Sequence, residues 1–338
     1  MSPKILKYVL IWLVVFSGHV MVFAGDPVTI SRETTFITEP RTSDGKRIDY
    51  LKAFEERAYP QGWNTEQNGY RLIAEKLGVD TMNTGYFGNE TEERQQLFVK
   101  NMYEKLVLSS PPKKAEEFVE ADTLLYKRWK NDPGKYLEFL GKIGHPWTLE
   151  TIPELKSWLN DVEPILQIVK EAAEKPVYFI PAVSYKENGT FSGCGVTEEM
   201  HRFRVFSRAL STCANYRLGT GDIDGAIDDI LTLRKLGSHL YHQQRVIPLL
   251  LGLAFFSISD PIGPEANLQR PASREQLQRL LEALQKRVPQ VDVTPHYEHE
   301  RYFGLDLLQR IAWGEDLKTI MNPSFESYPT SEQKKWQR

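Results

Sequence analysis

The chain has 338 residues, 42 Lys and Arg against 45 Asp and Glu, a formal net charge of −3 and 41% hydrophobic residues. This length and composition favour a globular protein with a sizeable buried core and exclude a disordered or fibrous one. A mildly acidic chain without a basic run carries no electrostatic footprint for nucleic acid, so no nucleic-acid partner is expected.

The N-terminus combines two early lysines with a mostly apolar stretch over residues 8–23. Val22 and Ala24 fit the small-residue pattern of a cleavage site, which predicts a signal peptide over residues 1–24 and export to the periplasm or the exterior. No stable membrane span is expected after cleavage. The alternative is an uncleaved helix that anchors the chain in a membrane, because the run is about as long as the shortest spanning helices, roughly 17 residues.

Beyond the signal, we expect an extended polar segment over residues 25–46, a single helical domain over residues 47–317 and a polar C-terminal tail over residues 318–338. Apolar residues recur every three or four positions through the middle part, which predicts amphipathic helices. Start and stop signals place these helices within residues 48–59, 64–78, 89–108, 111–134, 151–175, 197–218, 223–236, 246–258, 272–288 and 294–314.

Side chains that can cap helices precede several of these segments. Asn64 or Thr65 is the predicted cap of one helix, Asn89 of the next and Ser273 of a later one. Pro164 is expected to kink or restart the helix in which it lies.

One extended stretch stands out, "PVYFIPAVSY" at residues 176–185. A single short segment bounded by prolines does not make a sheet. The fold class predicted is therefore all-α, an irregular stack of antiparallel helical hairpins with at most one short strand.

The helix predicted at residues 246–258 is apolar almost all round and shorter than the roughly 20 residues needed to span a bilayer, so it is expected to be a central core helix. In the next helix four leucines are expected to point inward, Leu277, Leu280, Leu281 and Leu284.

The stretch "YRLGTGDIDGAIDDILTLRKL" at residues 216–236 joins two apolar-striped helices through a small-residue turn. It resembles one tetratricopeptide-type hairpin, with Tyr216 and Gly219 near the end of the first helix and Ala226 in the second. No second copy follows at a spacing of about 34 residues, so a regular array is not expected.

A broader resemblance rests on "TTFITEP", "IDYLKAFEERAYPQGWNTEQNGYRLIAEKLG", "HPWTLETIPELKSWL", "PVYFIPAV" and the hairpin. Together these segments resemble an uncharacterised family of exported helical proteins of planctomycete bacteria. The resemblance implies no activity and no catalytic residues. It implies that relatives continue for further helices, which would leave the last helical layer here incompletely covered.

The aspartates of the hairpin do not fit a calcium loop. With Asp222 and Asp224 at the third and fifth positions of an EF-hand loop, Leu231 falls where the bidentate carboxylate is required. Asp222 or Asp224 is instead predicted to cap the second helix, while Asp228 and Asp229 are expected to be exposed.

Histidines form the only candidate metal site. His239 with His242, and His296 with His299, stand three residues apart, so each pair shares one helix face. Neutral imidazoles so placed could bind zinc, which could activate water for hydrolysis. Neither stretch has the spacing of a known zinc hydrolase. The alternative interpretation is polar or half-buried side chains on helix surfaces.

The two cysteines, Cys194 and Cys213, are predicted to be unpaired, although export would permit a disulfide. Cys194 lies just before the helix predicted over residues 197–218, and a continuous helix places Cys213 about 24 Å from the start of that helix. A disulfide requires the two Cα atoms to lie within about 7 Å of each other.

No nucleophile elbow or phosphate-binding loop is present, and neither cysteine has the signature of a nucleophile. The sequence therefore favours an exported helical binding or scaffold protein with a protein or peptide partner and no cofactor. The alternative is a zinc-dependent hydrolase that uses His239, His242, His296 and His299.

Overall fold

The computed structural model describes residues 28–79, 92–109, 120–184, 191, 194–195, 197–269, 272–285 and 292–315, where the predicted all-α fold is confirmed. The predicted signal peptide and the predicted tail lie outside these residues, as does the Asn89 cap. The helices are α2 (Tyr50–Ala58), α3 (Gly69–Leu77), α4 (Glu92–Lys105), α5 (Ala121–Trp129), α6 (Pro133–Ile143), α7 (Lys156–Ala173), α8 (Thr197–Thr220), α9 (Ile223–Tyr241), α10 (Val246–Gln269), α11 (Arg274–Gln285) and α12 (Thr294–Ala312).

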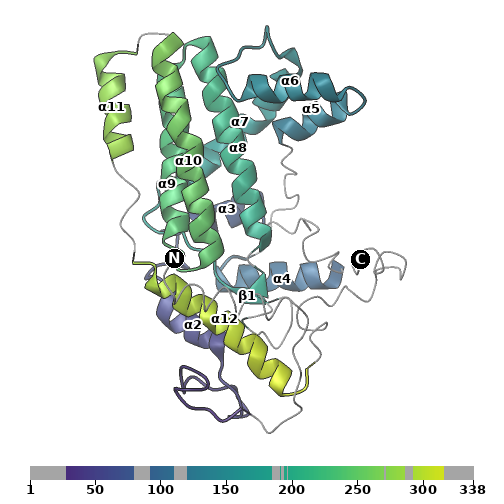
Figure 1. Cartoon of the computed structure of the whole chain (residues 1–338), viewed down its shortest axis with the longest axis vertical. Coiled ribbons are helices and arrows are strands. Elements are labelled where there is room, and N and C mark those ends of the chain that lie inside the picture. The colour runs from purple at the N-terminus through teal and green to yellow at the C-terminus, as the bar shows by residue number, and fades with distance from the viewer. Residues whose placement is uncertain are drawn as a thin grey trace, which may run out of the picture.

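The long helices α8, α9 and α10 lie side by side and form the centre of the molecule (Figure 1). Helix α7 packs against α8 and α9, and α11 packs against α9. Helices α2 and α12 pack on each other across the foot of this stack (Figure 1). Within the described part of the chain, no helix is both long and apolar enough to cross a membrane.

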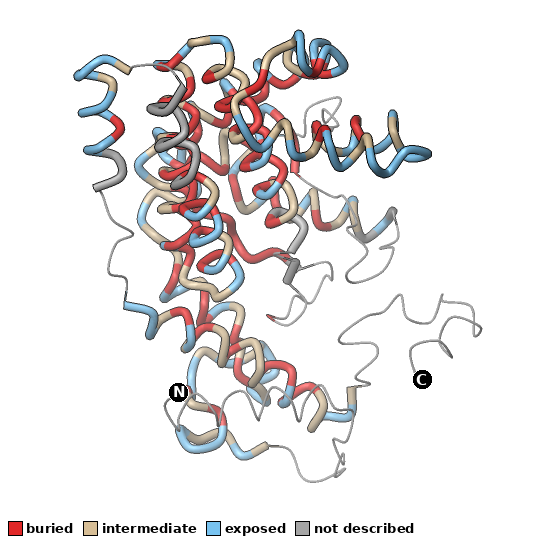
Figure 2. Tube along the Cα trace, turned by 45° about the horizontal axis from the view of Figure 1, so that its top comes forward, coloured by how far each residue is buried: buried red, intermediate tan, exposed pale blue. Residues whose placement is uncertain are grey.

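Buried side chains form two clusters. The larger extends through the stack from α3 to α10 and includes Phe203, Phe206, Leu210 and Cys213, the apolar stripe of α8. The smaller joins α2 to α12 and includes Ile37 from the N-terminal segment, which is 7% exposed. Figure 2 shows the buried positions gathered where helices face one another.

Several helix boundaries differ from the prediction. The cap of α3 is Asn68, not Asn64 or Thr65, because the Asn68 side chain accepts a bond from Tyr70 N and also exchanges bonds with Phe179 N and O. Helix α6 was not predicted, and Asp132, taken as part of a helix end, is its N-cap.

Two helices continue through prolines. Helix α7 runs through Pro164 without a restart, preceded by a short 3-10 turn at Pro153–Leu155. Helix α10 continues to Gln269, past Pro261, and is 24 residues long. The extended stretch supplies only β1 (Val183–Ser184), which pairs antiparallel with β2 (Cys194–Gly195), so two short strands are present where one was expected.

The end of α8 is held by Trp147. Its backbone N–H donates to Asn215 O at 3.2 Å, and its indole Nε1 donates to Thr212 O at 3.1 Å. A Cβ on Gly219 would lie 2.0 Å from Trp147 O, so only glycine permits this approach. The glycine before the turn therefore serves packing of the hairpin.

Candidate functional site

The four aspartates of the α8–α9 hairpin have separate structural roles. Asp222 caps α9, since its Oδ1 accepts from Gly225 N at 3.0 Å, as the sequence predicted. Asp224 and Asp228 face α11: Gln276 Nε2 donates to Asp224 Oδ2 at 2.9 Å, and Arg279 forms an ion pair with Asp228. These two carboxylates fasten α11 onto α9.

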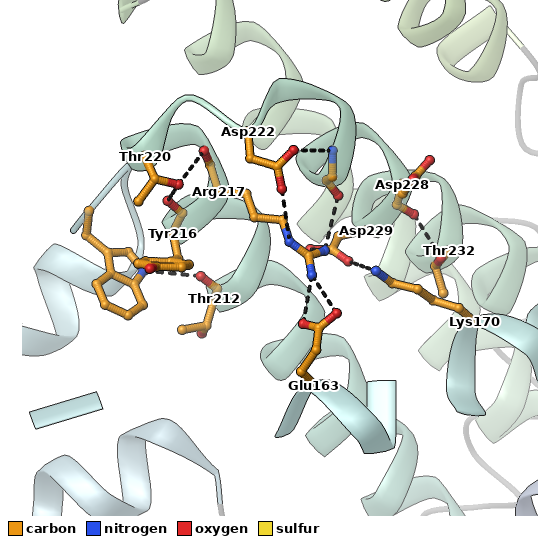
Figure 3. A network of polar contacts seen from close by, with 12 residues as sticks. Glu163, Lys170, Thr212, Tyr216, Arg217, Thr220, Asp222, Asp228, Asp229 and Thr232 are labelled. Atoms are coloured by element: carbon orange, nitrogen blue, oxygen red, sulfur yellow. Dashed lines mark hydrogen bonds and ion pairs between the residues drawn. The ribbon is translucent and has the colours of Figure 1, made fainter. Parts of the chain in front are cut away.

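Asp229 was expected to be exposed, and that expectation is wrong. Its side chain is 0% exposed and lies between two cations, Lys170 from α7 and Arg217 from α8 (Figure 3). Arg217 Nη1 donates to Asp229 Oδ2 at 2.6 Å, and Lys170 Nζ lies 2.6 Å from Oδ1. Each oxygen of the Asp229 carboxylate therefore faces a different cation.

Arg217 extends this cluster to the surface. Its Nη2 donates to both carboxylate oxygens of Glu163, at 2.9 and 2.7 Å, and its Nε lies 3.6 Å from Asp222 Oδ2 (Figure 3). The bonds to Glu163 on α7 and to Asp229 on α9 hold the guanidinium between these two helices. Five charged side chains from three helices thus form one ion cluster, defined here as Glu163, Lys170, Arg217, Asp222 and Asp229.

Burial raises the pKa of Asp229 to about 6, although Lys170 and Arg217 act in the opposite direction. Burial also raises the pKa of the Cys213 thiol, which is free and 2% exposed. A thiol held in its neutral form in the core is unreactive, so Cys213 has no nucleophilic role. Asp229, at the inner end of the ion cluster, is fully buried, whereas Glu163 and Asp222 at its outer end are about half exposed.

The four predicted histidines lie where the end of α9 meets α12. Ring nitrogens of three donate to backbone carbonyls: His239 Nε2 to Ala173 O at 3.0 Å, His296 Nε2 to Tyr241 O at 2.9 Å and His299 Nδ1 to Gln244 O at 3.1 Å. Metal ligands commonly orient themselves through such bonds, but a site also needs their remaining nitrogens to converge.

No such convergence is present in the described residues, where no group of three or more His, Cys, Asp or Glu side chains is placed to bind a metal. The ring of His299 packs edge-on against Phe54 at 4.9 Å between centroids, and Tyr178 stacks on His239 at 5.5 Å. The arrangement is that of packed histidines that bridge helix ends.

Desolvation lowers the pKa of His299 to about 4 and that of His239 below its ordinary value. Desolvation and the neighbouring His296 lower the pKa of His242, which lies at the surface. His239 and His299 are therefore neutral at neutral pH, as their burial requires.

The outer surface of α10 departs most from the expectation of a central core helix. Phe255 and Phe256 are buried, whereas Ile247, Leu250 and Leu253 are 47%, 59% and 38% exposed. These three side chains recur every three residues along one side of the helix, and we call them the α10 stripe. They are apolar, accessible and contiguous, as at many protein-binding surfaces.

The outer surface of α11 is also apolar in part. Of the leucines expected to point inward, Leu280 is 6% exposed, but Leu277 and Leu281 are 39% and 53% exposed. The two lie one turn apart on the side of α11 away from α9. The side chain of Leu284 lies outside the described residues. The four leucines have the i, i+3, i+4, i+7 spacing of one apolar stripe, and α11 packs on α9 through the edge of this stripe that contains Leu280, which the spacing alone does not reveal.

No protein-family model matches the chain, and neither the curated proteins nor the solved structures contain a significant match. The resemblance to exported planctomycete proteins and to a tetratricopeptide hairpin stays a prediction.

Proposed function

We propose that the chain is an exported helical protein that binds another protein or a peptide through the α10 stripe. The observation that supports this proposal is the exposure of Ile247, Leu250 and Leu253 on a helix that also supplies Phe255 to the core. A helix so firmly packed on one side presents its other side rigidly, which lowers the entropic cost of binding.

The spacing of the stripe fits a helical partner. Side chains three residues apart on α10 are matched by apolar residues at every third and fourth position of an amphipathic helix. The apolar side of such a partner helix would cover the α10 stripe, and the polar side of the partner would remain in water. Export is supported by the lysine-preceded apolar run and by Val22 and Ala24.

A photo-crosslinking amino acid at position 250 tests the binding surface. The mature protein, labelled in this way, is incubated with the exported fraction of the source cells, and a discrete adduct is expected. Leu137 on α6 is 64% exposed and provides the matched control position. Equal adducts at both positions, or none at position 250, would contradict the proposal.

A second variant tests whether the apolar side chains themselves bind. Ile247→Ser with Leu253→Ser is expected to reduce the adduct at position 250 while the far-ultraviolet circular dichroism stays that of the parent, because exposed side chains carry little of the fold's stability. The same preparation tests export, since N-terminal sequencing of the secreted protein is expected to begin at Gly25. A chain in the membrane fraction that still begins with its first residues would favour the anchored alternative.

A further inference from the structure

Helix α11 has two distinct sides. Its inner side faces α9 through the buried Leu280, through Gln276 on Asp224 and through Arg279 on Asp228. Its outer side forms a shallow depression lined by Arg274, Leu277, Gln278, Leu281 and Glu282. We call these five residues the outer face of α11.

The two charges of the outer face oppose the dipole of their own helix. Arg274 is the first residue of α11, near the positive end, and Glu282 lies in its last turn, which contains no basic residue. Among the described residues Arg274 has no ion-pair partner, while Glu282 accepts a bond from Gln278 at 3.1 Å. Arg274 and Glu282 each lie at the end of α11 whose dipole repels their charge. Beside a second helix that runs antiparallel, each charge lies next to the dipole end that attracts it.

We propose that the chain forms a twofold dimer in which the outer faces of two α11 helices pack antiparallel. Arg274 and Glu282 stand four residues on either side of Gln278. A twofold axis near Gln278 therefore sets Arg274 of each copy against Glu282 of the other and brings Leu277 close to Leu281 of the second copy. Each charge then lies beside the opposite end of the second helix dipole.

The outer face is complementary to itself, which identifies a second copy as the occupant. In a twofold interface, a residue that contacts another is contacted in return by the same residue of the other subunit. The order of positive charge, leucine, leucine and negative charge meets this condition only in the antiparallel direction. Parallel packing would set like charges against each other.

The dimer surface is separate from the α10 stripe. Helix α11 is fastened to Asp224 and Asp228 near the start of α9, whereas Gly252, next to the stripe, lies against Gly237 and Tyr241 near the end of α9. The dimer goes beyond the proposed binding function, and either can fail while the other stands. A helix of 12 residues, about 18 Å long, makes a small contact, so a reversible, concentration-dependent dimer is expected.

Sedimentation equilibrium of the mature protein over a wide concentration range tests this dimer. The parent is expected to associate reversibly, and Arg274→Glu or Glu282→Arg is each expected to raise the Kd about tenfold, because each creates two like-charge contacts per dimer. The double variant is expected to dimerise more tightly than either single reversal, because both pairs of opposite charges are present again. Either single reversal favours the dipole of α11, so weaker association cannot be ascribed to a less stable helix.

Two further variants complete the experiment. Leu281→Ser is expected to abolish association, whereas Leu137→Ser, at a somewhat more exposed position on α6, leaves it unchanged. A parent that is monomeric at every concentration would overturn the dimer, as would a double variant no better than the single reversals. If the Kd is unchanged in the Arg274 and Glu282 variants but association is lost in Leu250→Ser, the contact lies on α10. That result would also overturn the proposed α11 dimer.

Discussion

The ion cluster and the histidine junction bury polar groups in different ways. At the junction of α7, α8 and α9, Asp229 is enclosed with its charge opposed by Lys170 and Arg217. Where α9 meets α12, His296 and His299 are enclosed as rings that donate to the carbonyls of Tyr241 and Gln244. In the first region a buried carboxylate faces two cations, whereas in the second region buried imidazole rings face backbone carbonyls.

The two regions therefore respond to acid in opposite directions. The pKa of Asp229 is about 6, above the unfolded value of about 3.9, so its contribution to stability is full below that lower value and is lost as pH rises through 6. The pKa of His299 is about 4, below the unfolded value of about 6.5, so its contribution is present above the latter and is lost as pH falls toward 4.

The largest effect is expected from breaking the ion cluster. Asp229→Ala leaves Lys170 and Arg217 without their shared carboxylate in a buried position, and we expect a loss of about 3–5 kcal/mol in the free energy of unfolding. Denaturant titration measures this loss. The neighbouring Asp228→Ala is the matched control, because its pair with Arg279 is half exposed; equal losses in both variants would contradict a buried cluster.

A smaller loss is expected from the histidine junction. His296 is 1% exposed, and His296→Ala removes both its packing near Tyr241 and its bond to Tyr241 O. We expect about 2–4 kcal/mol, from a cavity together with an unpaired carbonyl. Tyr297→Ala, on the exposed side of the same helix turn, should cost far less. A similar cost at both positions would argue against a tight α9–α12 junction.

The pH dependence of stability separates the two regions directly. Between pH 6.5 and 4, Asp229→Asn should lose more stability on acidification than the parent, because the variant no longer gains from protonation of Asp229. His299→Gln should lose less than the parent over the same interval. For each variant, the change in the free energy of unfolding from pH 6.5 to 4 is expected to differ from that of the parent by about 2 kcal/mol. For His299 this is less than the full pKa shift would give, because the ring is partly solvated. If stability depended on pH in the same way in the parent and in both variants, the ion cluster and the histidine junction would not respond to acid in opposite directions.

The smallest effect is expected where α11 is fastened to α9. Arg279→Ala removes a half-exposed pair with Asp228, for which we expect about 0.5 kcal/mol and a further decrease of that difference in high salt. Thermal melting at two ionic strengths measures it. A loss as large as that of Asp229→Ala would show that α11 is part of the buried charge system.

Several local features of the fold were predictable from neighbouring residues. Ser273 caps α11 as predicted, and Asp222 is one of the two residues predicted to cap α9, because a capping side chain bonds to a backbone N–H three residues away. The end of α3 at Gly78, where φ is +80°, follows from the same local chemistry. Helix α6 was missed because Asp132, Pro133 and Gly134 were interpreted only as the end of the preceding helix, whereas Asp132 caps α6 and Pro133 begins it.

The histidine pairs show where prediction from spacing stops. Spacing placed His296 and His299 on one side of a helix, and both are indeed buried together on α12. It could not tell a metal ligand from a packed ring, because that depends on which groups face the remaining nitrogens. The carbonyls that accept from His239, His296 and His299 lie 55 to 66 residues away along the chain, on Ala173, Tyr241 and Gln244 respectively.

The sequence by itself determined that this protein is helical and where its main hairpin turns, and it limited the cap of the second helix to Asp222 or Asp224, since periodicity and capping act within a few residues. Only the tertiary structure decided that Asp229 is buried while Asp228 is half exposed, and that the α10 stripe and the outer face of α11 remain uncovered. Burial depends on which helices, distant in sequence, pack against a position. Of two adjacent residues on one helix, one can therefore face the core and the other can face water.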